Sequence, residues 1–517
     1  MSSLPWSVPV LCVSVICVLS SSAFDLAKPS AGQAKWLDHE VGAVIHFNMQ
    51  TFNKSMSQGD VAPPDTFNPS ELSVDQWVGA AVSFGAKWVT LTLSHFSGFL
   101  LWPSESYKYT VRNTKWRGGN GDLAWDLIQS CKKHNIEHGF YLSVHNNWFM
   151  DVNNYRVRND SEKSAFFNAS LAQFQEIFGP ESKYKDPFYL WMDAGIVKGV
   201  SPDVGSLFDK LAPNTVCDEC PTFARYNGLR WVGNEQAVAP LPNWYAVKEG
   251  KCGTNTHGAE KDMGTPTGEQ FCPSSCDTVV REHYWFWWNN TENTVKTPQR
   301  LLQQYLTSVG RGCTLILDMN PDPRGLIPDP DLKAYQGFGE GVKLLYKHPV
   351  FIEKGPKLSI LVAKTWEISI KAANGSVVLM EDIVAYGQRV EEYRLYFITA
   401  DGPIGELGST IGHKRIHPFP AEVAGKEVHG IELVLTKLVI GGSLQLRQVA
   451  VYDWSEAVKR GYLDSRDNHV DSNGKHVNSS GKNVDTGDKH MDNNDSHVES
   501  DANHVTSDEK HAGSNDM

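Results

Sequence analysis

Short apolar runs rich in β-branched and aromatic residues alternate with helical patterns from about residue 36 to residue 320. This alternation is typical of βα units arranged around a parallel sheet. Strands are expected at 41–47, 88–94, 139–144, 188–193 and 313–319. Since the segment is long enough for eight such units, the pattern predicts a (β/α)8-like barrel.

Helix starts in this region carry signals of their own. Ser73 and Gln76 have the spacing of a capping box, Asp122 precedes an amphipathic run, and Thr297 stands before a proline. Each arrangement is typical of the first turn of a helix. We therefore expect helices to begin directly after these three sites.

The pattern changes near residue 350 to alternating apolar and polar positions, for example at 357–363 and 393–398, interrupted by Gly, Pro and Asn. A period of two with frequent turn residues is typical of antiparallel strands. A C-terminal antiparallel β-sandwich is therefore expected after the barrel.

The two ends of the chain differ from the rest. Residues 8–19 are apolar and small residues follow them, which predicts a signal peptide. The tail repeats histidines at intervals of seven or fourteen among Asp, Asn, Ser and Gly, a composition that predicts disorder. The expected divisions are a signal peptide at 1–23, the barrel at 24–345, the sandwich at 346–456 and the tail at 457–517.

A signal peptide predicts a secreted or lysosomal glycoprotein. In such a protein, sequons indicate glycosylation sites and cysteines can form disulfides. The sequons are at Asn53, Asn159, Asn168, Asn289, Asn374, Asn478 and Asn494. The cysteines from Cys217 to Cys276 are expected to form disulfides, whereas Cys131 and Cys313 lie in apolar segments and are expected to be buried thiols. The C-x-x-C spacing of Cys217 and Cys220 also occurs in redox and zinc sites, but a structural disulfide is the favoured interpretation.

Charge and hydropathy limit the partners. The net charge of -12, without clustered Lys and Arg, argues against nucleic acid. After the N-terminal run no apolar stretch is long enough to span a bilayer, so no integral membrane segment is expected. No cofactor is indicated, and the oligomeric state stays open.

Two carboxylates are candidates for catalysis. Asp193 ends the expected strand 188–193, where it can act on a substrate or cap the next helix. Glu235 follows a plausible fifth strand in a loop rich in Gly and Asn, although most glutamates are simply exposed. Glycosidases require one ionised and one protonated carboxyl group. Asp193 and Glu235 can meet that requirement.

Two histidines end expected strands as well. His46 ends the first strand and His95 the second, so both should lie at the barrel mouth with Asp193. Neutral imidazoles suit hydrogen bonding to sugar hydroxyls. The same three side chains could also bind a metal ion, and the sequence does not exclude that alternative.

Eight motifs occur together in this chain. They are VIHF at 44–47, GAKWVTLTLSHFSGFLLWPS at 85–104, GFYLS at 139–143, LWMDAG at 190–195, RWVGNE at 230–235, YWFWW at 284–288, SVGRGCTLILDMNP at 308–321 and GQRV at 387–390. In this order they resemble the α-L-fucosidases of glycoside hydrolase family 29. The resemblance extends over about residues 36–454, and the glutamate of RWVGNE resembles the branch restricted to α-1,3 and α-1,4 linkages.

This resemblance implies a retaining α-L-fucosidase that acts on fucosylated oligosaccharides or glycoproteins and needs no metal. It implies Asp193 as nucleophile, Glu235 as acid/base, and His46, His95, Tyr141 and Trp285 as contacts to fucose. Trp102, Trp191 and Arg230 are implied as walls of the site, with a packing role equally open.

Two departures from the family pattern bear on sugar binding. Phe96 stands where the family has a second histidine, and Gln58 lies where the family has Glu-Trp-Gly. Each loss removes a hydrogen bond worth about 0.5 to 1.5 kcal/mol. Two alternatives therefore stay open: a catalytically weak or silent, lectin-like fucose-binding protein, and a broad-specificity fucosidase, against which RWVGNE argues.

Overall fold

The computed structural model describes residues 25–55, 61–153, 156–157, 160–193, 195, 210, 212–220, 227–253, 263–371 and 374–463. The expected signal peptide and nearly all of the histidine-rich tail lie outside these residues, as do Gln58, Asn159, Asn478 and Asn494.

Eight parallel strands form the first sheet, in the order β7-β6-β3-β2-β1-β12-β11-β8. They are β1 (Val41–Ile45), β2 (Trp88–Ser94), β3 (Glu137–Leu142), β6 (Tyr189–Met192), β7 (Val216–Asp218), β8 (Arg230–Trp231), β11 (Ser274–Thr278) and β12 (Thr314–Met319). A parallel bridge between Cys217 and Gly228, which lies just before β8, brings the two ends of this order together. The sheet is thus nearly closed, and the predicted (β/α)8-like barrel is confirmed.

The five strands predicted from apolar runs are β1, β2, β3, β6 and β12. The sequence did not predict β7, which has three residues, or β11, whose five residues are mostly polar although all are buried. The prediction that Glu235 follows a fifth strand is wrong for this reason. It follows β8, the sixth barrel strand in chain order.

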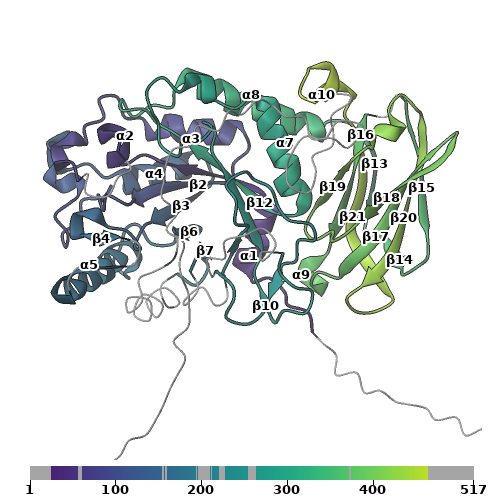
Figure 1. The fold of residues 1–517 in the computed structure, drawn as a ribbon, viewed down its shortest axis with the longest axis horizontal. Coiled ribbons are helices and arrows are strands. Elements are labelled where there is room, and N and C mark those ends of the chain that lie inside the picture. Colours follow the sequence, from purple (N-terminus) through teal and green to yellow (C-terminus); the bar gives the residue numbers. More distant parts are fainter. Residues whose placement is uncertain are drawn as a thin grey trace, which may run out of the picture.

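Helices surround the barrel strands (Figure 1). They are α1 (Ala31–His39), α2 (Met49–Asn53), α3 (Val74–Ser83), α4 (Leu123–Lys133), α5 (Asp160–Phe178), α7 (Pro298–Ser308) and α8 (Asp329–Leu345). The predicted caps Ser73, Asp122 and Thr297 each accept a hydrogen bond from the backbone N–H three residues later. The Gln76 amide bonds to the backbone of Ile327.

Short paired strands lie outside the barrel sheet. β4 (Val152–Asn153) pairs with β5 (Arg156–Val157), and β9 (Ala246–Val247) pairs with β10 (Gln270–Phe271). Both pairs are antiparallel.

The C-terminal part is the predicted antiparallel β-sandwich. One sheet contains β13 (Pro349–Lys354), β14 (Lys357–Ser359), β16 (Gly375–Glu381), β19 (Arg415–Pro418) and β21 (Ser443–Asp453). The other contains β15 (Lys364–Ile370), β17 (Val390–Thr399), β18 (Gly402–Gly408) and β20 (Val428–Leu438). Their inward side chains form a core separate from the barrel cores. The short helix α9 (Ile383–Tyr386) follows β16.

Polar contacts join the sandwich to the barrel. Lys414 forms an ion pair with Glu40, which ends α1. The Tyr245 N–H donates to Gln388 Oε1 at 2.8 Å, and the Asn243 N–H donates to Thr410 Oγ1 at 2.9 Å. The interface is therefore held by specific partners as well as by packing.

The chain continues past the sandwich as helix α10 (Ser455–Lys459). Ala457 and Leu463 are buried in the barrel core, and Tyr462 donates to Glu340 of α8 at 2.9 Å. Residues 457–463 are therefore packed against the barrel, although the sequence analysis assigned them to the tail.

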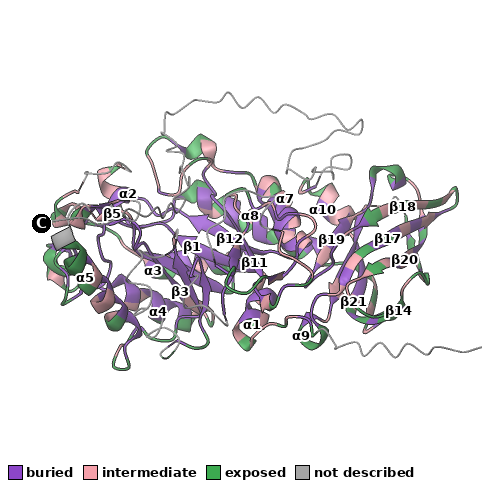
Figure 2. Cartoon of the chain, turned by 60° about the horizontal axis from the view of Figure 1, so that its bottom comes forward, coloured by how far each residue is buried: buried purple, intermediate pink, exposed green. Residues whose placement is uncertain are grey.

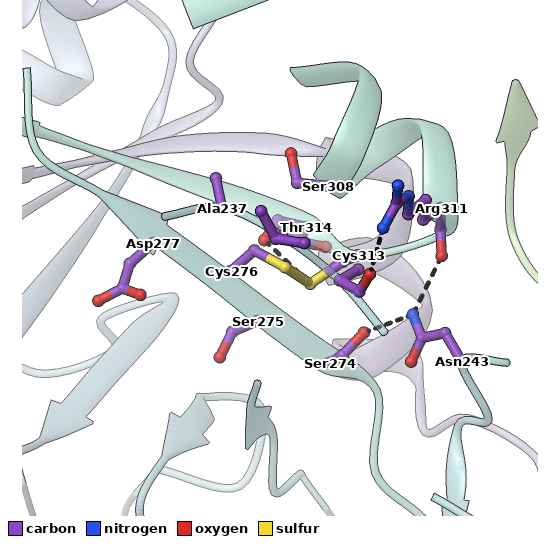
Figure 3. The surroundings of a disulfide bond; sticks show 12 residues. Ala237, Asn243, Ser274, Ser275, Cys276, Asp277, Ser308, Arg311, Cys313 and Thr314 are labelled. Atoms are coloured by element: carbon purple, nitrogen blue, oxygen red, sulfur yellow. Dashed lines mark hydrogen bonds between the residues drawn. A yellow bond between two sulfur atoms is a disulfide. The ribbon is translucent and has the colours of Figure 1, made fainter. Parts of the chain in front are cut away.

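Among the described residues three disulfides form, Cys217–Cys220, Cys252–Cys272 and Cys276–Cys313, and Cys131 is a buried free thiol. The prediction that Cys313 is a buried thiol is wrong. Figure 3 shows Cys313 joined to Cys276 of the adjacent strand β11, beside the bonds that Asn243 donates to Ser274 and Arg311. Apolar flanks indicate burial but do not reveal which strand lies alongside.

The barrel strands are almost wholly buried, whereas the surrounding helices carry exposed faces (Figure 2). No helix within the described part of the chain is long and apolar enough to cross a membrane.

Candidate active site

The predicted site residues come from the carboxyl ends of several barrel strands. His46 directly follows β1, His95 follows β2, and Asp193 follows β6. Tyr141 lies near the end of β3 and pairs in register with Trp191 of β6. Because all these strands are parallel, their carboxyl ends meet at one mouth of the barrel, where barrel enzymes place their active sites.

The two histidines are buried and held by different partners. His46 Nδ1 lies 2.7 Å from Oδ1 of Asp318 in β12, and neither side chain is more than 5% exposed. His95 Nδ1 lies 3.1 Å from the Gln50 side-chain nitrogen. Burial, aided by the neighbouring His46 and His145, lowers the pKa of His95 well below its usual range. His95 is therefore neutral at physiological pH.

Contacts at Nδ1 fix the orientation of both rings. His46 Nδ1 faces the Asp318 carboxyl group, and His95 Nδ1 faces the Gln50 side-chain amide. The two ring centroids lie 5.6 Å apart.

Asp193 is partly buried and receives a strong hydrogen bond. The Tyr141 hydroxyl donates to Asp193 Oδ2 at 2.5 Å. Burial and the Asp193 charge raise the pKa of Tyr141 well above its usual range, so the phenol stays protonated as a donor. Tyr141 also stacks on His95, with centroids 5.4 Å apart.

Glu235 lies in the loop after β8 and keeps exposed surface. Its pKa is nevertheless raised, first because surrounding protein atoms displace water from the carboxyl group, and further because Asp193 and Asp318 are close. A hydrogen bond from the Trp285 side chain acts in the opposite direction. Glu235 therefore holds its proton to higher pH than an ordinary glutamate.

The loop of Glu235 is attached to β11. The Ala237 N–H donates to the Asp277 carbonyl at 3.0 Å, and Trp231 Nε1 donates to Asp277 Oδ1 at 2.8 Å. Asn234 accepts from the N–H groups of Gln236 and Val238. These bonds give an exposed glutamate a defined backbone position.

Trp285 and Phe286 form an aromatic side of the site. The Trp285 ring lies 4.9 Å from His46, and the Phe286 ring lies 4.9 Å from His95. The structure thus brings together all six predicted residues, Asp193, Glu235, His46, His95, Tyr141 and Trp285.

The residues implied as walls have defined partners. Trp102 is buried and donates to Glu176 of α5 at 2.7 Å, which is a packing position. Arg230 is buried and donates to Asn243 and to the Trp244 carbonyl, in the loop that meets the sandwich. Trp191 lies beside Tyr141 at 5.8 Å and is the one of the three that borders the site.

Several functional candidates were not predicted. His145 is hydrogen-bonded to the main chain of Asp193 and packs on Phe96, with centroids 5.2 Å apart. It directly follows the expected strand 139–144, and that position could have identified it. Asp277 and Glu219 are buried acids whose strands were too short or too polar to be predicted.

Phe96, the substitution noted in the sequence, contacts the site directly. Its ring lies 4.2 Å from His95 and 5.9 Å from Trp148. An apolar ring therefore stands where a hydrogen-bonding side chain was expected.

Within the described residues, no group of three or more His, Cys, Asp or Glu side chains is arranged to hold a metal ion. Asp318 and Gln50 engage the Nδ1 atoms of the two histidines.

Comparison with known proteins agrees with this geometry. The family model described as Alpha-L-fucosidase matches residues 18–344. Alpha-L-fucosidase 1 of Arabidopsis thaliana is 31% identical over 326 residues, which are 61% of this chain and 60% of that protein. A protein of Oryza sativa subsp. japonica named as an alpha-L-fucosidase is 28% identical over 449 residues, 76% of this chain and 80% of its own length.

Solved structures resemble the chain as well. A Bacteroides thetaiotaomicron VPI-5482 structure, assigned to the alpha-L-fucosidases, has a TM-score of 0.73 at 26% identity and covers 83% of this chain and all of its own. A glycoside hydrolase family 29 fucosidase of Ruminococcus gnavus, in complex with fucose, has a TM-score of 0.66 at 21% identity, over 84% of this chain and 97% of its own. At that identity the second likeness concerns the fold alone.

Proposed function

Because this chain belongs to the alpha-L-fucosidase family, and is therefore a glycoside hydrolase, we propose that it releases α-1,3- or α-1,4-linked fucose with retention of configuration. The proposed substrate is a branched glycan or glycoprotein.

One observation carries the proposal. Two carboxyl groups from different strands lie at one barrel mouth in unlike environments. Asp193 accepts a short hydrogen bond from the Tyr141 hydroxyl. Glu235 has a raised pKa, so it holds its proton to higher pH than an ordinary glutamate. An ionised and a protonated carboxyl group are the pair that a retaining glycosidase uses.

In the first step, a carboxylate oxygen of Asp193 attacks the anomeric carbon while the bond from that carbon to the leaving oxygen breaks. Glu235 gives its proton to the leaving oxygen, and a covalent fucosyl–Asp193 ester forms. In the second step, Glu235 takes a proton from water, and the water oxygen displaces Asp193. Both residues return to their starting protonation states.

His46 and His95 are proposed to orient the sugar. Because Nδ1 of each ring faces a protein partner, the Nε2 atoms are the ones proposed to bond with sugar hydroxyls. Trp285 supports the site from the other side through its bond to Glu235. Held neutral by burial, His95 adds no positive charge beside the departing group.

The linkage restriction rests on the RWVGNE motif and on the place of Glu235 after β8. A linkage panel with α-1,2-, α-1,3-, α-1,4- and α-1,6-fucosylated oligosaccharides tests it. Release is expected from the α-1,3 and α-1,4 compounds, with the α-anomer of fucose appearing first by NMR. Preferential α-1,2 or α-1,6 release contradicts the linkage, and initial β-fucose contradicts retention. Absence of hydrolysis with measurable binding favours the lectin-like alternative.

A secreted or lysosomal location is proposed from the N-terminal apolar run and the sequons. Asn168 and Asn289 are exposed, so glycosyl transfer there leaves the folded surface undisturbed. Expression in a secreting eukaryotic host, followed by peptide mass analysis with and without glycan removal, tests this. Retention of residues 1–23 in the mature chain contradicts the proposed signal peptide.

A further inference from the structure

The segment between β11 and α7 contains Trp285 and Phe286, which form the aromatic side of the site. One buried residue, Arg281, holds the first part of this segment in place. Arg281 has no exposed surface. Its guanidinium donates to both carboxylate oxygens of Asp331, at 2.9 and 2.7 Å, and to Thr291 Oγ1 at 2.8 Å. Thr291 in turn donates to the Trp288 carbonyl at 2.8 Å.

The backbone closes the same loop. Arg281 forms bridges with Tyr284 and with Val295, and the Glu282 N–H donates to the Thr294 carbonyl at 2.9 Å. Arg281 thus holds both ends of residues 281–295 through its backbone and the middle through its side chain. Trp285 and Phe286 lie within the closed loop.

We propose that Arg281 and Asp331 are positioning residues, whose buried ion pair fixes the loop that holds Trp285 against Glu235 and Phe286 against the histidines. The proposal deepens the proposed function and rests on the assigned role of Glu235. Neither residue touches the expected place of the sugar, and both act through the loop.

Helix α8 connects this ion pair to a second part of the site. Asp331 lies in the first turn of α8, and Tyr335, one turn later, donates to the Asp318 carbonyl at 2.8 Å. Asp318 is the partner of His46. One rigid helix therefore supports both the loop of Trp285 and the strand end that orients His46.

A bidentate arginine is suited to this task. Its planar fork fixes direction as well as distance, whereas a lysine ammonium at the same place fixes neither. Nε and Nη2 of Arg281 reach Asp331 while Nη1 reaches Thr291, so the three bonds use donors spread over three nitrogens. The arrangement therefore depends on the shape of the guanidinium as well as on its positive charge.

The effect on catalysis passes through Glu235. The Trp285 hydrogen bond lowers the pKa of Glu235 against the increase that burial causes. The other charged or titratable groups facing Glu235 are Asp193 from β6, Asp277 from β11, Asp318 from β12, His46 after β1 and Tyr141 from β3. A loosened loop removes the Trp285 bond and leaves these groups in place, so the pKa of Glu235 should increase.

The test uses Arg281→Met/Asp331→Leu, which removes both charges together because a single deletion would leave a buried charge unpaired. The matched control is Glu40→Gln/Lys414→Met, which removes another largely buried pair that joins no loop of the site. Arg281→Lys and Trp285→Phe complete the set.

Hydrogen exchange of the full-length protein reports the loop without reference to activity. Amides of residues 282–294 should exchange at least about tenfold faster in Arg281→Met/Asp331→Leu, and at unchanged rates in the control. The value of kcat/KM should fall by about tenfold to a hundredfold. The alkaline limb of kcat should move to higher pH, as in Trp285→Phe, and Arg281→Lys should lie between these variants and the parent.

Unchanged exchange in residues 282–294 overturns the inference, whatever the activity. The inference is also overturned if Arg281→Met/Asp331→Leu exchanges faster but keeps the pH profile of kcat of the parent, while Trp285→Phe moves the alkaline limb. Failure of the proposed function has a different signature. If Glu235 is not the acid, Glu235→Gln should still show the alkaline limb of kcat.

Discussion

At the residue scale, the two carboxyl groups of the site differ in the hydrogen-bond donors that surround them. Asp193 accepts from the Tyr141 hydroxyl, whereas Glu235 accepts from the Trp285 side chain, and surrounding protein atoms that displace water raise the Glu235 pKa. In the proposed mechanism, attack and proton donation therefore fall to different residues. Two substitutions can test these roles.

Asp193→Ala and Glu235→Ala should have different signatures. Without its nucleophile the first should lose activity at least about 1000-fold on every substrate. The second should lose about 100- to 10,000-fold where the leaving group needs protonation, and far less with fluoride as leaving group. Added azide distinguishes the roles, because it enters from the vacated side.

In Glu235→Ala, azide should capture the intermediate and give α-fucosyl azide, whereas Asp193→Ala should give the β-azide. Product anomers are read by NMR. The β-azide from the Glu235 variant, or full activity of either variant on a natural oligosaccharide, contradicts the assigned roles.

Tyr141→Phe should lower kcat with a smaller change in KM. The phenol donates one short, charge-assisted hydrogen bond to Asp193, worth about 1.5 to 3 kcal/mol, which corresponds to about tenfold to a hundredfold in rate. Steady-state kinetics measures it, with Tyr109→Phe as the control because Tyr109 donates to the Ala62 carbonyl instead. Equal losses in both variants would indicate a general packing effect.

At the element scale, β11 and β12 support the site in ways that their hydropathy does not indicate. Polar β11 is buried along its length and provides Asp277 behind the Glu235 loop. The Cys276–Cys313 disulfide joins it to the residue directly before β12. The loop that this disulfide closes contains Arg281 and Trp285. A single covalent bond therefore limits how far the chain around the aromatic side of the site can spread.

Cys276→Ala/Cys313→Ala should lower the free energy of unfolding by about 2 to 4 kcal/mol, since the bond spans 37 residues and restricts the unfolded chain. Thermal unfolding under non-reducing conditions measures the change. Cys252→Ala/Cys272→Ala, whose bond spans 20 residues, is the comparison and should lose less. A larger loss in the comparison variant contradicts the entropic explanation.

At the scale of the whole molecule, the barrel and the sandwich are joined by a largely buried ion pair. Burial alone would raise the pKa of Glu40, but the Lys414 ammonium and His413 lower it to about 2. A carboxyl group whose folded-state pKa is depressed stabilises the fold above its unfolded pKa of 4.5, and this stability is lost as pH falls toward 2.

Glu40→Gln should therefore destabilise the protein by about 3 kcal/mol at neutral pH, as for removing one partner of a buried pair. The difference from the parent should shrink as pH falls from about 4.5 toward 2, because the parent then protonates Glu40. Denaturant unfolding at several pH values measures both. A difference independent of pH would mean that packing, not charge, is responsible.

Deleting residues 464–517 should leave the melting temperature and kcat unchanged. The residues from α10 to Leu463 contact α8 and the barrel core and are kept in this variant. Truncation before Ser455 is the control and should lower stability, since it removes Ala457 and Leu463. A lower melting temperature after the shorter deletion contradicts a separate tail.

The sequence alone predicted the barrel, the sandwich, five barrel strands and three helix starts, and it proposed Asp193, Glu235, His46 and His95 as site residues. These features are local: apolar runs, period-two alternation and capping residues act within a few positions, and a residue ending a parallel strand belongs to the barrel mouth. The family resemblance added the roles that spacing could not supply.

Only the tertiary structure decided the rest. The pairing of Cys313 with Cys276, the place of His145 beside Asp193, and the polar strand β11 all depend on which segments lie side by side. The same holds for the Arg281–Asp331 pair, whose members are 50 residues apart. Burial converts ordinary polar side chains into strong, specific partners, and burial is a property of the assembled fold that no local pattern contains.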